Sequence, residues 1–237
     1  MLKQKLLVIG LMAALSTTAM GFSLDSVVKG AAVASEVCKF AGKAIDEKGL
    51  GPIQQGLVKS AKQVSQDYLG AQSKLASALN MKEAVAQLKA QADVLKKGNI
   101  NSDKLEKVTT VGAAAGEAIE KQLKEAEKLT DKQKEEVKKS LSKYGDAALG
   151  TAGLAGKTLL ASGAVLCVAS NNPLNAMKIK DKFSFVGDAA STLPGFAGDL
   201  ITTGFSYVKL LKRFDIDTSA FEKQLKNAQS ELSKAEK

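Results

Sequence analysis

Apolar residues recur at intervals of three and four residues along three consecutive segments, and this rhythm constrains the fold more than any other feature. The positions are Leu57, Ala61, Val64, Tyr68, Ala71, Leu75 and Ala78, then Met81, Val85, Leu88, Ala92 and Leu95, then Leu105, Val108, Gly112, Ala115, Ile119, Leu123 and Ala126. Residues spaced in this way share one face of an α-helix, as they do in coiled coils. The sequence therefore predicts an all-α fold, a multi-helix antiparallel bundle of about six to eight helices.

Residues typical of helix ends separate these segments. A first helix is expected from Ser23 to about residue 45, with Gly49 and Gly51 ending it and Pro52 opening the next helix. Further along, Thr130 and Gln133 have the spacing of a capping box, in which each side chain bonds to the backbone of the other.

Two glycines inside the segment 102–126 indicate close helix packing. Gly112 and Gly116 are four residues apart and lie on the same helical face, where the absence of a side chain lets another backbone approach. The alanine-rich seam around them is interpreted as bundle core, with a dedicated partner site as the alternative.

The segment 147–169 is almost wholly apolar and small, and Lys157 is its only charged residue. A helix that is hydrophobic on all sides belongs in a protein core or in a membrane. Its glycines, including Gly153, Gly156 and Gly163, and the central lysine favour a buried helix within the bundle over a membrane span.

Aromatic residues concentrate after this segment, so the core is expected to be thickest there. Six of the eight phenylalanines lie between Phe183 and Phe221. Pro194 and Gly195 predict a break between two helices, and Ser219 with Glu222 predicts the start of the last one.

The first 21 residues have the layout of a secretory signal peptide. Lys3 and Lys5 precede an apolar run from Leu6 to Leu15, and small residues follow up to Gly21. The expected organisation is a signal peptide at 1–21 and a single all-α domain at 22–237, with amphipathic helices at 22–145 and a more apolar core part at 146–237. The mature protein is expected in the periplasm or the extracellular medium.

Cys38 and Cys167 are the only two cysteines, and each is expected on the apolar face of a helix. An exported protein with an even number of cysteines usually pairs them, so the sequence predicts a disulfide between the two. Two buried thiols are the alternative.

The chain carries a formal net charge of +9 at pH 7, and every basic residue except Arg213 is a lysine. Lysine lacks the planar fork with which arginine reads guanine edges and phosphates, so no specific nucleic-acid binding is expected. The excess charge would favour an anionic partner, whereas interspersed lysines can also simply keep a protein soluble.

Catalysis is not expected, because the sequence contains no histidine and no recognisable catalytic motif. Residues 151–158 end in Gly-Lys-Thr, but no strand precedes them and the first glycine is out of register, which excludes a phosphate-binding loop. Asp188 and Asp199 have apolar neighbours and are assigned to capping or turn roles. No metal or other cofactor is predicted.

Two functional hypotheses follow from these features. The first is an exported, non-enzymatic helical bundle that binds an envelope component or a protein partner. The alternative is a membrane-active or pore-forming protein that inserts the segments 147–169 and 183–211. The sequence sets neither the partner nor the oligomeric state.

Overall fold

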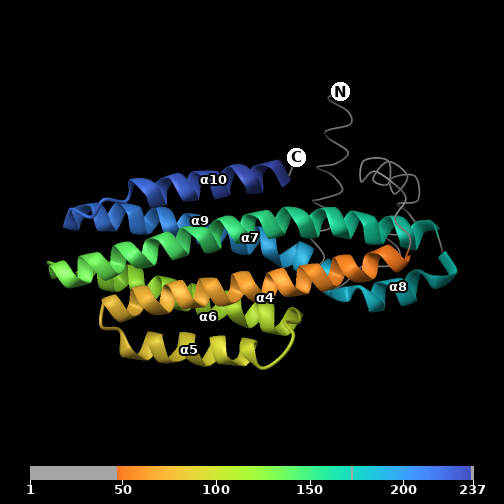
Figure 1. Ribbon diagram of the computed structural model, residues 1–237, viewed down its shortest axis with the longest axis horizontal. Coiled ribbons are helices and arrows are strands. Elements are labelled where there is room, and N and C mark those ends of the chain that lie inside the picture. Colours follow the sequence, from red (N-terminus) through yellow and green to blue (C-terminus); the bar gives the residue numbers. More distant parts are fainter. Residues whose placement is uncertain (1–46, 172, 236–237) are drawn as a thin grey trace.

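The computed structural model describes residues 47–171 and 173–235. All regular structure within these residues is helical, which confirms the all-α prediction. The helices, labelled as in Figure 1, are α4 (Glu47–Ala78), α5 (Lys82–Lys96), α6 (Ser102–Glu125), α7 (Asp131–Asn171), α8 (Ala176–Lys182), α9 (Ser184–Leu211) and α10 (Ser219–Ala235), with the short 3₁₀ helices η1 (Pro173–Asn175) and η2 (Lys212–Phe214). The predicted signal peptide, the first predicted helix up to residue 45 and Cys38 lie outside the described residues.

Helix α7 is the centre of the bundle. It is 41 residues long and packs against α4, α9 and α10, while α5 and α6 pack against α4 and each other. Figure 1 shows the long helices running side by side along the long axis, with α8 at one end. The predicted seam residues of α6, such as Leu105, Val108 and Ile119, are at most 1% exposed.

The prediction that Gly49 and Gly51 end a helix is wrong, because both lie in the first turns of α4. Pro52 is the sixth residue of this helix, so its missing N–H removes only one hydrogen bond near the end. Gly51 has no Cβ to clash with the proline ring, and Leu50 is only 1% exposed. Burial of Leu50 thus favours the longer helix.

Helix α9 also continues through a predicted break. It runs from Ser184 to Leu211 with Pro194 inside it, although an internal proline destabilises a helix by about 3 kcal/mol. Leu193 and Phe196 on either side of the proline are 0% and 4% exposed, respectively. Burial of these side chains offsets the lost backbone bond.

The capping box at the start of α7 is present. The backbone N–H of Thr130 donates to Gln133 Oε1 at 3.0 Å, and the N–H of Gln133 donates to Thr130 Oγ1 at 3.3 Å. These bonds satisfy backbone donors that a helix start otherwise leaves to water.

Replacing Thr130 by alanine is expected to lower the free energy of unfolding by about 1 kcal/mol, because it removes the acceptor for the Gln133 N–H. Denaturant titration followed by circular dichroism measures the change. Thr130→Ser keeps the hydroxyl and should retain most of the stability; equal losses in both variants would contradict the capping role.

Candidate functional site

A shallow groove of about 300 Å³ lies on the surface between α4 and α7. Its lining comprises Ser60, Gln63 and Val64 from α4 and Gly150, Gly153, Leu154 and Lys157 from α7. Two residues that the sequence singled out, Gly153 and Lys157, therefore line the same groove.

Lys157 is the one charged side chain among the residues that line the groove, and the lining contains little else that could react. Lys157 is exposed, and nothing lies within 4 Å of the point where a Cβ on Gly153 would stand. Gln63 Nε2 already donates to both carboxylate oxygens of Asp67, at 3.0 Å each. The groove can contact a small anionic or polar group, but its lining contains neither an acid–base pair nor an activated nucleophile.

Residues 151–158 lie inside the continuous helix α7, so their backbone N–H groups do not form a phosphate-binding loop. Thr151 Oγ1 donates to the carbonyl of Ala147 at 2.7 Å, and Thr158 Oγ1 donates to Ala155 at 2.9 Å. Both hydroxyls are therefore used within the helix.

The remaining predicted residues of α7 lie elsewhere on this helix. An added Cβ on Gly156 would stand 3.2 Å from the Cβ of Ala235 in α10, and Gly163 is half-buried. Cys167 is 9% exposed. Because Cys38 lies outside the described residues, the disulfide stays a prediction.

Helix α7 is the only described helix that is long and apolar enough to cross a membrane. Its most apolar stretch is 56% buried in the bundle, and Lys157 and Leu160 are exposed. A core helix of this composition satisfies the same criteria of length and hydropathy.

The two glycines of α6 lie where this helix meets its neighbours. A Cβ added to Gly112 would collide with the Tyr68 ring of α4. One added to Gly116 would stand 3.4 Å from Thr203 Cγ2 of α9 and 3.5 Å from Gln72 Nε2 of α4. Both glycines therefore face the interior of the bundle.

Five aromatic rings form a cluster in the core, where α4, α7, α9 and α10 meet. Tyr144 lies edge-on to Tyr68, Tyr207 and Phe221, with ring centroids 5.9, 5.5 and 5.9 Å away. Phe196 lies 5.1 Å from Tyr68 in the same geometry. We call these five residues the tyrosine cluster. Edge-to-face packing of this kind stabilises a core beyond the burial of apolar area.

The hydroxyl groups of the tyrosine cluster bond within the protein. Tyr144 donates to the carbonyl of Leu200 at 3.2 Å, Tyr207 donates to Gly116 at 3.4 Å, and Gln72 donates to the Tyr68 hydroxyl at 2.8 Å. Burial raises the pKa of all three tyrosines well above 10. They are neutral at physiological pH, and the cluster is structural.

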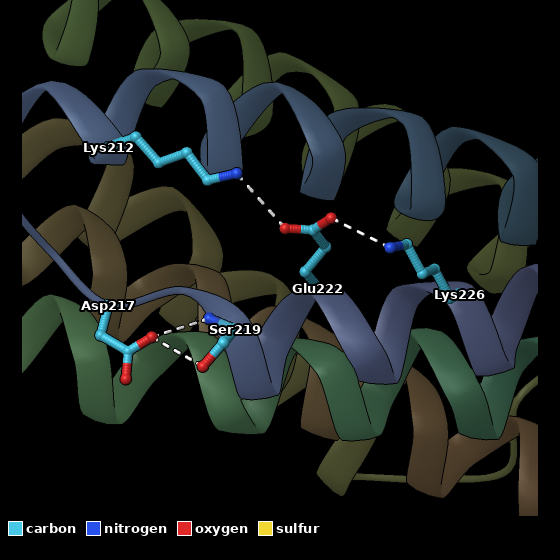
Figure 2. A network of polar contacts seen from close by, with 5 residues as sticks. All are labelled: Lys212, Asp217, Ser219, Glu222 and Lys226. Atoms are coloured by element: carbon cyan, nitrogen blue, oxygen red, sulfur yellow. Dashed lines mark hydrogen bonds and ion pairs between the residues drawn. The ribbon is translucent and has the colours of Figure 1, made fainter.

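A charged network fixes the start of α10 (Figure 2). Lys212 and Lys226 contact the two carboxylate oxygens of Glu222 at 3.4 and 3.1 Å, and hydrogen bonds from Lys226 and Lys212 lower the pKa of Glu222. Asp217 Oδ1 accepts bonds from the Ser219 N–H and hydroxyl, which lower the pKa of Asp217. The expected pairing of Ser219 with Glu222 is thus replaced by separate partners for each.

The capping or turn roles assigned to Asp188 and Asp199 are wrong, because both residues lie inside the continuous helix α9. Asp188 lies within α9 and is half-buried, and its Oδ2 accepts a bond from Ser102 Oγ at 2.5 Å. Asp199 is exposed. Across residues 47–171 and 173–235, no group of three or more His, Cys, Asp or Glu side chains has an arrangement that could hold a metal ion.

An exposed apolar surface at the end of the bundle was not predicted from the sequence. Leu174 in η1 and Met177 in α8 are 96% and 62% exposed. The signal available in the sequence was the placement of apolar residues directly after the helix stop at Asn171 and Pro173, but periodicity cannot assign a face to so short a segment.

The described residues thus define an all-α helical bundle with a surface groove that contains Lys157 and with one exposed apolar end. No family model, curated protein or solved structure shows significant similarity to this chain.

Proposed function

We propose that the protein is an exported, non-enzymatic helical bundle that binds an anionic component of the cell envelope. The supporting observation is a pair of lysines across α4 and α7. Lys74 and Lys143 are both exposed, and the neighbouring side chain of Lys143 lowers the pKa of Lys74. Lys157 lies about four turns further along α7.

Two neighbouring ammonium groups repel each other, and a bound anion relieves this repulsion. Lysine is a flexible point charge, which suits phosphate headgroups or acidic polymers better than ligands that require bidentate recognition. The net charge is +9 for the full chain and +7 without Lys3 and Lys5 of the predicted signal peptide, and it favours the same class of partner. The lysine pair is therefore the proposed centre of binding.

A double variant, Lys74→Gln with Lys143→Gln, is expected to weaken binding to vesicles that contain phosphatidylglycerol by about 30-fold. This loss corresponds to about 1 kcal/mol for each lysine near an anionic surface. Sedimentation of the mature protein with vesicles at low salt measures the affinity.

The matched control carries the same charge change on α5, as Lys82→Gln with Lys89→Gln, and both of these lysines are exposed. It should bind at least several-fold better than the α4–α7 variant. Equal binding of the two variants would contradict a role for the lysine pair, and failure to bind vesicles, lipopolysaccharide and acidic polysaccharide alike would contradict the proposed function.

Export and the disulfide form part of the same proposal. Cleavage after Gly21 would leave Phe22 as the new N-terminus, and oxidation of Cys38 with Cys167 would remove two hydrogens from the mass of the mature protein. Mass spectrometry of protein from separated cell fractions tests both points.

Membrane activity is the second candidate function, favoured by the length and hydropathy of α7. In this proposal the segments 147–169 and 183–211 leave the bundle and insert into a bilayer. Leakage of a trapped dye from anionic vesicles would support it, and its absence across a broad pH range would remove it.

A further inference from the structure

The end of the bundle formed by η1 and α8 exposes two large apolar side chains three residues apart. Among the described residues, the exposed large hydrophobic side chains are Val94, Leu160, Leu174 and Met177. Leu174 is 96% exposed, which is more than any of the others. In Figure 1 the α7–α8 connection and α8 lie at one end of the long axis.

The rest of α8 is anchored, so these side chains are held outward on a fixed support. Ala176 and Ile179 are 6% and 1% exposed, and Phe183 directly after the helix is 1% exposed. Gln54 Nε2 of α4 also donates to the carbonyl of Lys182 at 3.0 Å. Exposure of Leu174 and Met177 is therefore a property of the folded bundle.

Basic residues accompany the apolar ones. Three of the seven residues of α8 are lysines, Lys178, Lys180 and Lys182, against the single acidic Asp181. Lys178 is exposed and Lys180 is half-buried. Apolar side chains with neighbouring lysines match the chemistry of an anionic bilayer surface, where the former enter the headgroup boundary and the latter meet phosphates.

We infer that Leu174 and Met177 insert into the headgroup region of an anionic phospholipid bilayer, with Lys178 and Lys180 contacting lipid phosphates. The inference rests on the proposed function in taking the envelope component to be anionic, and it identifies that component as the lipid surface. Two side chains are too few for the roughly 800 Å² per partner that a stable protein interface buries, which argues against a second copy of the chain.

The absence of tryptophan from the chain provides a direct test. Leu174→Trp places a single indole at this end, and the nearly full exposure of Leu174 means that the substitution should not disturb the core. With vesicles of phosphatidylglycerol and phosphatidylcholine, its emission should shift to the blue and be quenched by brominated acyl chains. Val94→Trp, on α5, is the control and should show neither effect.

A second measurement removes the apolar contact. The double variant Leu174→Ser with Met177→Ser is expected to bind the same vesicles at least about tenfold more weakly, because it loses the two apolar side chains that would be buried in the bilayer. Val94→Ser should bind as the unchanged protein does. Helix content from circular dichroism verifies that each variant is folded.

Several results would overturn the inference. If the protein binds vesicles while the indole at position 174 stays unshifted, this end does not insert, although the proposed function survives. A blue shift without lipid that grows with protein concentration would assign the surface to a second copy. A blue shift without lipid that does not depend on protein concentration would mean that another part of the chain covers position 174. Equal vesicle binding by the Leu174–Met177 and Val94 serine variants would also contradict insertion.

Discussion

Replacing Tyr144 by alanine is expected to lower the free energy of unfolding by about 3 to 5 kcal/mol, the range found for deletion of a buried aromatic ring. Tyr144 is 0% exposed and contacts the rings of Tyr68, Tyr207 and Phe221. Its removal leaves a cavity among helices α4, α7, α9 and α10. Because a domain is typically stable by about 5 to 15 kcal/mol, the variant should lose a large share of its stability.

The control for this variant is Tyr144→Phe, which keeps the ring and removes the bond to the carbonyl of Leu200. It should lose only about 1 kcal/mol. Urea titrations followed by circular dichroism give both values. A loss of under 1 kcal/mol in the alanine variant would show that the tyrosine cluster is not a rigid part of the core.

Stability is also expected to fall steeply with rising pH above 10. All three tyrosines of the chain, Tyr68, Tyr144 and Tyr207, belong to the buried cluster, and burial raises their pKa. In the unfolded chain they ionise near pH 10. A raised pKa leaves the stability intact below pH 10, and above it each tyrosine favours unfolding by about 1.4 kcal/mol per pH unit, or roughly 4 kcal/mol for three.

An alkaline titration that follows tyrosinate absorbance and helical circular dichroism together tests this expectation. Tyrosinate should appear only as the helix signal disappears, in one cooperative transition. Tyr144→Phe, with two tyrosines left, should reduce the slope of stability against pH by about one third above pH 10. Tyrosinate formed near pH 10 in a fully helical protein would contradict the burial of the cluster.

Much of the helical arrangement follows from the sequence, because apolar spacing and caps are local signals. The seam of α6 and the capping box at Thr130 are examples. The breaks expected at Gly51 and Pro194 are wrong because burial of neighbouring side chains, a tertiary effect, offsets the local preference against helix. Propensity along the chain does not contain that information.

In the candidate sites, too, some features follow from the local sequence and others depend on tertiary packing. The sequence singled out Lys157 and Gly153 by composition, but their grouping with Ser60 and Gln63 depends on the contact between α4 and α7. The exposed end at Leu174 could not be predicted, since only the packed bundle decides which apolar residue remains uncovered. Likewise, the collision of a Gly112 Cβ with Tyr68 is visible only in three dimensions.

The central position of α7 has a consequence for biosynthesis. Residues 47–125, which include α4, are synthesised before any part of α7. Helices α9 and α10, which also pack on α7, follow later. The nascent N-terminal half therefore cannot bury the side of α4 that faces α7 until late in translation.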